Sequence, residues 1–200
     1  MALIALGVSG GISAYKSVEV ARQLQRQGHE VVAVMTANAQ KFIGPLTFEA
    51  ITRRRVLLDQ YEPGVNTDID HIALASSIDL LLVAPATANV IGKFSHGIAD
   101  DFLSSLFLAT TAPVLVAPAM NTNMYENVAV QANYRVLLER GVLFIAPDDG
   151  YLACGWIGKG RLAEPDVIVS AVGECLRRDG DWVGRVVLVT AGPTYEDIDP

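Results

Sequence analysis

The sequence predicts an α/β fold built on a doubly wound, mostly parallel sheet. Three observations lead to this prediction. Short runs rich in Val, Ile and Leu alternate with longer amphipathic runs along most of the 200 residues. The short runs are apolar throughout, as is typical of strands that helices cover on both faces. Hydrophobic side chains make up 51% of the chain and charged ones 18%, so a single domain of this length would bury a substantial core.

Each short run that is dominated by β-branched residues or leucine is expected to be a strand. In chain order the expected strands are Leu3–Leu6, Glu30–Met35, Asp79–Ala84, Val114–Ala117, Val142–Ala146 and Val186–Thr190. Elsewhere apolar residues recur at helical spacing. The expected helices are Ser13–Gln27, Ala39–Ile43, Phe48–Thr52, Ile72–Ser77, Ala88–Ala109, Tyr125–Arg140 and Asp166–Arg178. Gly28 and Gly141 stand directly after two of them, where a left-handed residue commonly ends a helix.

Charge and cysteine content limit the classes of function. The formal net charge is −7, so a nucleic acid or an anionic membrane would be repelled. The two cysteines, Cys154 and Cys175, are too few for a disulfide framework, which favours a reducing, cytoplasmic location. The apolar N-terminal residues lack a basic leader, so we expect neither a signal peptide nor a membrane span. We expect no metal site.

The carboxyl ends of four expected strands are rich in small and polar residues. In an open α/β sheet, ligands bind beyond these ends. The four segments are Gly7–Ser13, Thr36–Asn38, Pro85–Asn89 and Pro118–Asn121. Placed side by side, they would form one long polar crevice.

The first of these segments has the pattern Gly-x-Ser-Gly-Gly-x-Ser, which leads from a strand into a helix. Gly10 and Gly11 would let the backbone approach a phosphate, and the helix start would supply free N–H groups. The spacing differs from that of dinucleotide folds, and Thr36 stands where an acidic residue would read a ribose, so a mononucleotide phosphate suits it better. A tight turn with ordinary helix capping is the alternative explanation.

Two further positions have both a functional and a structural explanation. Thr87 and Asn89 precede a long helix, where either could simply be an N-cap. His71 opens another helix, and the helix dipole would favour a neutral imidazole that accepts a proton. A capping or solvent-facing role would also account for His71.

The segment Asp148–Pro165 contains four glycines and cannot be regular structure for long. A loop of this length in a compact domain is usually functional, and often a lid. Cys154 lies within it beside Gly155, which would make the thiol accessible.

Together these segments resemble the flavin-dependent cysteine decarboxylases, in particular the phosphopantothenoylcysteine decarboxylases of coenzyme A biosynthesis. The resemblance covers about residues 1–180. Its matching segments are Ser9–Ile12, Thr36–Asn38, His71, Pro85–Asn89, Lys93, Gly97–Asp101, Pro118–Asn121 with Met124, Ala153–Gly155, and Gly158-x-Gly160-Arg161. The pairing of Pro-Ala-Met-Asn with Ala-Cys-Gly is the most specific feature.

The resemblance implies a Rossmann-like flavoprotein that binds FMN and decarboxylates 4'-phosphopantothenoylcysteine to 4'-phosphopantetheine. The flavin would oxidise the substrate thiol to a thioaldehyde, which accepts the electrons that departing CO2 leaves behind. The implied FMN-binding residues are Gly10, Gly11, Ile12, Thr36, Asn38, Thr87, Ala88, Asn89, Val90 and Met120.

The resemblance also implies roles for individual side chains. His71 would act as the base near the thiol, Asn121 would hold the substrate carboxylate, and Cys154 would protonate the enethiolate. Met124 and Ala153 would help to hold the substrate. The family forms trimers, often assembled further, with sites at subunit contacts, so we expect a homo-oligomer.

Two departures and two alternatives accompany the resemblance. Trp156 stands where the family commonly has an acidic residue, and Leu162 where it usually has methionine. A flavin prenyltransferase shares the fold but lacks the two paired motifs. A non-catalytic regulatory flavoprotein would lack one catalytic group or carry a long acidic tail.

The end of the sequence has a second resemblance. Residues 186–194 look like the opening strand and turn of a phosphopantothenate–cysteine ligase domain. We therefore expect a decarboxylase domain over residues 1–180, followed at 181–200 by a linker and the start of a ligase domain. A chain that ends at Pro200 would carry no ligase activity.

Overall fold

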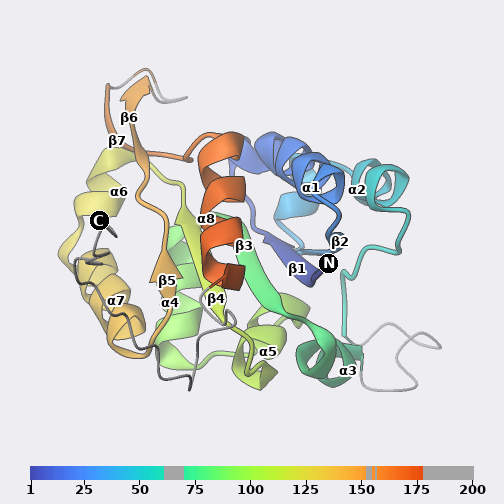
Figure 1. Ribbon diagram of the computed structural model, residues 1–200. Helices are drawn as coiled ribbons and strands as arrows, with labels where there is room; N and C mark the ends of the chain where they lie inside the picture. Colours follow the sequence, from blue (N-terminus) through green and yellow to red (C-terminus); the bar gives the residue numbers. More distant parts are fainter. Residues whose placement is uncertain (61–69, 152–154, 156, 178–200) are drawn as a thin grey trace, which may run out of the picture.

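The computed structural model describes residues 1–60, 70–151, 155 and 157–177, and these form a five-stranded parallel sheet flanked by helices (Figure 1). The strand order is β2-β1-β3-β4-β5. The strands are β1 (Leu3–Val8), β2 (Glu30–Met35), β3 (Leu80–Ala86), β4 (Val114–Pro118) and β5 (Leu143–Phe144). The order reverses between β1 and β3, which creates the switch point where such folds bind ligands. The predicted doubly wound sheet is confirmed; the predicted strand Val186–Thr190 lies outside the described residues.

Helices cover both faces of the sheet. One face is covered by α1 (Lys16–Arg26), α2 (Pro45–Thr52) and α8 (Pro165–Arg177). The opposite face is covered by α3 (Asp70–Ser77), α4 (Ala88–His96), α5 (Phe102–Ala109) and α7 (Val128–Glu139). Short elements complete the chain, namely η1 (Ile12–Tyr15), η2 (Ala39–Lys41) and α6 (Thr122–Glu126). Figure 1 shows α8 crossing in front of the sheet and α4 behind it.

Alternate residues of each central strand enter opposite halves of the core. In β3, Leu80 and Leu82 pack in the cluster that includes α1 and α8, whereas Leu81 packs in the cluster that includes α4 and α5. All three leucines are fully buried. Burying a leucine side chain is worth about 1.5–3 kcal/mol relative to leaving it exposed. Both halves of the core thus demand apolar residues, which explains the uninterrupted apolar runs.

Two predicted helices are each divided in the structure. The segment predicted as one helix over Ala88–Ala109 ends at Gly97, whose φ is +69°, and restarts after Asp101. Asp101 accepts a hydrogen bond from the Ser104 N–H at 2.8 Å, in a capping box that begins α5. The segment predicted as Tyr125–Arg140 is likewise divided into α6 and α7 at Asn127, which caps α7. Gly97 and the pair Asp100-Asp101 mark the first break in the sequence, but the apolar residues on either side led to the prediction of a single helix.

The segment Asp148–Pro165, expected to be a loop that cannot be regular structure for long, contains two short strands. Within it, β6 (Asp148–Tyr151) and β7 (Ile157–Arg161) pair as an antiparallel hairpin. The hairpin extends beyond the sheet beside α6, which β7 contacts (Figure 1). Strands this rich in glycine carry no alternating pattern, so nothing in the sequence suggested them.

Among the helices of the described residues, none has the length and hydropathy needed to cross a bilayer.

Candidate active site

Two adjoining cavities lie at the carboxyl ends of β1 to β4. The first cavity has a volume of about 420 Å³ and the second about 430 Å³. Gly10, Thr87, Ala88 and Met124 line both, so the cavities meet at the loops that follow β1 and β3. The expected crevice therefore exists as two connected compartments.

All ten residues expected to bind the cofactor line one or both cavities. Gly11, Ile12 and Met120 line the first cavity. Thr36, Asn38, Asn89 and Val90 line the second, and Gly10, Thr87 and Ala88 line both. Residues from four loops thus line two adjoining cavities.

Ser9 ties the loop after β1 to the loop after β3. Its side chain is buried, its Oγ donates a hydrogen bond to the Pro85 carbonyl at 2.7 Å, and it accepts one from the Thr87 N–H at 3.0 Å. Thr87 in turn caps α4, since its Oγ1 accepts a hydrogen bond from the Val90 N–H at 3.5 Å. The capping role considered for Thr87 is thus present, and it also places the start of α4 at both cavities.

Gly10 makes the close approach of two loops possible. A Cβ at this position would lie 2.4 Å from the Asn38 Cβ and 2.9 Å from its carbonyl carbon. At Gly11, by contrast, a Cβ would meet only the Thr87 methyl group, at 3.6 Å. The bare backbone at Gly10 and Gly11 borders the cavities; because the Gly11 N–H already donates to the Ser9 carbonyl at 3.0 Å, an anion in this cradle would have to be bound by the other main-chain N–H groups.

An ion-pair cluster forms one wall of the second cavity. Lys93 Nζ lies 2.6 Å from Asp100 Oδ1 and 2.7 Å from Asp101 Oδ2. Burial by itself would lower the pKa of Lys93, but hydrogen bonds to the two carboxylates outweigh it and raise that pKa. Burial would likewise raise the pKa of Asp101, but hydrogen bonds from Lys93 and Ser104 lower it overall. The cluster therefore holds the break between α4 and α5 in a fixed, charged state.

Asn121 and the hairpin meet on the wall of the first cavity. Asn121 caps α6, and its Oδ1 accepts a hydrogen bond from the Asn123 N–H at 2.9 Å. The neighbouring Met120 N–H donates to the Gly160 carbonyl at 2.9 Å. A Cβ at Gly160 would lie 2.2 Å from the Met120 oxygen, so only glycine lets β7 lie this close. The donor of the Asn121 side chain is its amide nitrogen, while its oxygen accepts from the start of α6.

His71 does not join this group. It lies in α3 and lines neither cavity. Its ring packs edge-on against Phe102, with centroids 6.1 Å apart, and Phe102 directly follows the cavity residue Asp101. Its buried Nδ1 has no hydrogen-bond partner among the described residues.

Three of the remaining predicted positions, Ala153, Cys154 and Trp156, lie outside the described residues. Met124 is described; it lines both cavities and is 49% exposed. Leu162 lines the first cavity.

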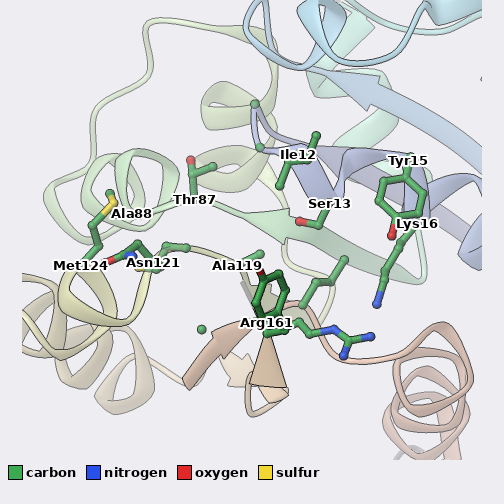
Figure 2. A pocket seen from close by; sticks show the side chains of 16 residues that line it. Ile12, Ser13, Tyr15, Lys16, Thr87, Ala88, Ala119, Asn121, Met124 and Arg161 are labelled. Carbon is green, nitrogen blue, oxygen red and sulfur yellow. The ribbon is translucent and has the colours of Figure 1, made fainter. Parts of the chain in front are cut away.

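Two polar residues that the sequence had not singled out, Tyr15 and Lys16, also line the first cavity, together with Ser13 and Arg161 from segments that it had. Ser13, Tyr15 and Lys16 come from η1 and the start of α1, and Arg161 from the end of β7 (Figure 2). The spacing of Lys16, four residues after Ile12, places both on one helical face and was a usable signal. Nothing local in the sequence pointed to Arg161 as a neighbour of Lys16.

The site as described offers main-chain N–H groups, hydroxyl groups, the amides of Asn38, Asn89 and Asn121, and the cations Lys16, Lys93 and Arg161 around a partly apolar space. Within the described part of the chain, no group of three or more His, Cys, Asp or Glu side chains is arranged to hold a metal ion. Such a site suits a ligand that carries phosphate and an extended neutral body.

Comparison with known proteins identifies similar chains. Residues 2–177 match the protein family described as Flavoprotein. The chain is 47% identical over 199 residues to the coenzyme A biosynthesis bifunctional protein CoaBC of Bacillus subtilis, covering 98% of this chain and 49% of that protein. The chain thus spans about half the length of the curated relatives it matches.

Two solved structures are similar over most of their length. A cysteine-to-serine variant of PPC decarboxylase complexed with pantothenoylaminoethenethiol is 31% identical, with a TM-score of 0.77, over 86% of this chain and 97% of that one. The FMN-dependent cysteine decarboxylase SpaF is 32% identical, with a TM-score of 0.76, over 89% of this chain and 97% of that one.

Proposed function

The chain belongs to the flavoprotein family, and from that premise we propose that it catalyses the FMN-dependent decarboxylation of 4'-phosphopantothenoylcysteine to 4'-phosphopantetheine. One observation carries the proposal. The Pro-Ala-Met-Asn segment and the glycine-rich hairpin meet, through Met120 and Gly160, on the wall of a cavity whose opposite wall is the glycine loop after β1. Filling this cavity with side chains would stabilise the fold, so an open cavity at the junction favours a role in ligand binding.

The residues around the second cavity fit the phosphate of FMN. Gly10 presents bare backbone, Thr87 presents the start of α4, and Thr36 and Asn38 line the same cavity, while Gly11 lines the first cavity. A Cβ at Gly10 would fill this cradle. When bound, the flavin would supply the two-electron acceptor for oxidation of the thiol-bearing carbon, and the resulting thiocarbonyl would let the carboxylate on the adjacent carbon leave as CO2.

Asn121 is proposed to bind the substrate carboxylate. The hydrogen bond from α6 to the Asn121 Oδ1 fixes the orientation of the amide group. The amide nitrogen would therefore donate to the carboxylate, and the amide would not flip to present its oxygen instead. The held geometry keeps the scissile bond in one orientation, which is a larger contribution than a mobile side chain could make. Met124, beside it, offers an apolar contact to the substrate chain.

Cys154 and His71 complete the proposed chemistry. Cys154 would protonate the decarboxylated enethiolate, a task that suits a thiol with a pKa near its ordinary value of about 8.5. His71 would act as the base at the substrate thiol. Because His71 lines neither cavity, we propose a homo-oligomer, a trimer or an assembly of trimers, in which His71 serves the site of a neighbouring subunit. The exposed apolar side chains Ile72 and Leu108, on α3 and α5, support such a contact.

We also propose that a full-length protein carries a further domain and is located in the cytoplasm. The curated relatives are bifunctional and about twice as long, so residues 181–200 would lead into a fused ligase domain in a full-length protein. Coenzyme A synthesis and the low cysteine content fit a cytoplasmic location.

The test is CO2 release from 4'-phosphopantothenoylcysteine by the FMN-loaded chain. Asn121→Asp should reduce kcat/KM by at least about 100-fold, because a second carboxylate would face that of the substrate. Asn123→Asp is the matched control: it adds the same charge two residues further on, at an exposed side chain outside both cavities, and should retain most activity. Equal rates for the two variants would remove Asn121 from the mechanism, and no CO2 from the unmodified chain would end the proposal.

A further inference from the structure

The first cavity has two chemically different ends. Figure 2 shows Asn121 and Met124 at one side, close to Thr87, and Lys16 and Arg161 at the other. The wall between them is mostly small or apolar and includes Ala119, Ile12 and Leu162. A ligand that fills this cavity is expected to be polar at both tips and largely neutral between them.

Lys16 and Arg161 form what we call the cationic end. Lys16 Nζ lies 3.0 Å from both carboxylate oxygens of Glu164, and Arg161 pairs with the same carboxylate. Two positive charges thus share one negative charge. The Lys16 side chain is only 12% exposed, so little water compensates its excess charge.

The surroundings of the cationic end favour an added anion. Lys16 is the first residue of α1, where the helix dipole is positive. Tyr15, whose side chain carries a hydroxyl, lines the same cavity as Lys16. Glu164 holds the two cations in place before a ligand arrives, which lowers the entropy cost of binding an anion between them.

We propose that Lys16 and Arg161 bind the 4'-phosphate of the substrate, while Asn121 binds the carboxylate at the other end. This inference rests on the proposed function. A phosphomonoester carries close to two negative charges at neutral pH and offers three acceptor oxygens. A guanidinium meets such oxygens with paired N–H groups, and an ammonium meets them as a compact charge. The proposed function assigns the phosphate of FMN to the second cavity, which Gly10 lines and which neither Lys16 nor Arg161 lines.

The inference makes Lys16 and Arg161 the residues that select the phosphorylated substrate. Removing either cation should weaken binding only when the ligand carries the phosphate. The product pair 4'-phosphopantetheine and pantetheine isolates this effect, because the two ligands differ only in the phosphate and neither has a carboxylate to lose.

The experiment is titration calorimetry of both ligands with the FMN-loaded protein and three variants. Lys16→Gln and Arg161→Gln should each weaken binding of 4'-phosphopantetheine by about 10- to 100-fold and leave pantetheine within about twofold. Arg22→Gln, which removes one exposed charge from the same helix outside both cavities, should change neither. Arg161 is 42% exposed, so its variant is expected to fold even if the Lys16 variant does not.

Three results would overturn the inference. The first is an equal loss of affinity for both ligands, and the second is no loss for either. The third comes from a parallel titration of the apoprotein with FMN and riboflavin: if the variants abolish the preference for FMN but keep that for 4'-phosphopantetheine, the cations serve the cofactor. Product binding needs no turnover, so a protein that released no CO2 would contradict the proposed function without altering this result.

Discussion

Replacing Gly160 by alanine tests whether the contact between β7 and Met120 shapes the substrate cavity. Gly160 has a φ of +129°, and an added Cβ would lie 2.2 Å from the Met120 oxygen. Ordinary contact would require β7 to move away by about 1 Å. The hydrogen bond from the Met120 N–H to the Gly160 carbonyl, now 2.9 Å, would then exceed hydrogen-bonding range.

The expected cost follows from these two effects. Loss of the hydrogen bond is worth about 1 kcal/mol, and forcing an extra methyl group into a packed contact about 1–3 kcal/mol. The sum, about 2–4 kcal/mol, corresponds to an exchange rate of the Met120 amide hydrogen that rises about 30-fold or more. Substrate affinity should fall as well, because Met120 and Asn121 line the cavity.

Hydrogen exchange of the Met120 amide is the direct assay, with Gly150→Ala as the control. Gly150 lies in the same hairpin with a φ of +156°, yet a Cβ there would meet only the Arg161 side chain, at 3.5 Å. Alanine at Gly150 therefore has the same cost of placing a side chain at a positive φ, but its Cβ does not overlap a main-chain atom. If both variants left Met120 exchange unchanged, or accelerated it equally, the hairpin contact would not have the role described.

Three other predictions follow from the same geometry. Gly10→Ala should weaken FMN binding at least about tenfold, because its Cβ would lie 2.4 Å from a neighbouring Cβ, whereas Gly11→Ala should have a much smaller effect; fluorescence titration of FMN measures both, and equal affinities would contradict the cradle. Since the pKa of Asp101 is lowered through its contact with Lys93, its contribution to stability is present above about pH 4 and lost as the pH falls through the lowered value. Asp101→Asn should therefore reduce the melting temperature at pH 7 more than at pH 3, and a constant difference would refute this linkage. Cys154→Ser should bind FMN and substrate yet accumulate the decarboxylated enethiol with the flavin left reduced, so full turnover by this variant would exclude Cys154 as the proton donor.

The sheet and its ligand-binding edge were predictable because each depends on a local pattern. Leu80–Val83 reads as one apolar run since both faces of β3 are covered, and Gly28 and Gly141 adopt the left-handed conformation expected after a helix, with φ of +85° and +86°. Parallel strands place their carboxyl ends at one edge, so the segments that follow them were expected to meet. They do meet, around the two cavities.

What the sequence missed depends on contacts between distant residues. Lys16 and Glu164 are separated by 148 positions, and their pairing follows only from the packing of α1 near the end of the hairpin. At the break between α4 and α5, Lys93 pairs with Asp101 across eight positions, a contact that the pattern of apolar residues does not predict. His71 illustrates a third case, because its residue type predicted a role but not its distance from the cavities.

Absorbance spectroscopy of the FMN-loaded chain during anaerobic addition of 4'-phosphopantothenoylcysteine tests the central claim most directly. We expect the purified chain to bind FMN, and the visible flavin band to change on substrate addition as CO2 is released. A chain that takes up no FMN, or a flavin spectrum that substrate leaves untouched while no CO2 forms, would contradict the assignment of the two cavities to flavin and substrate.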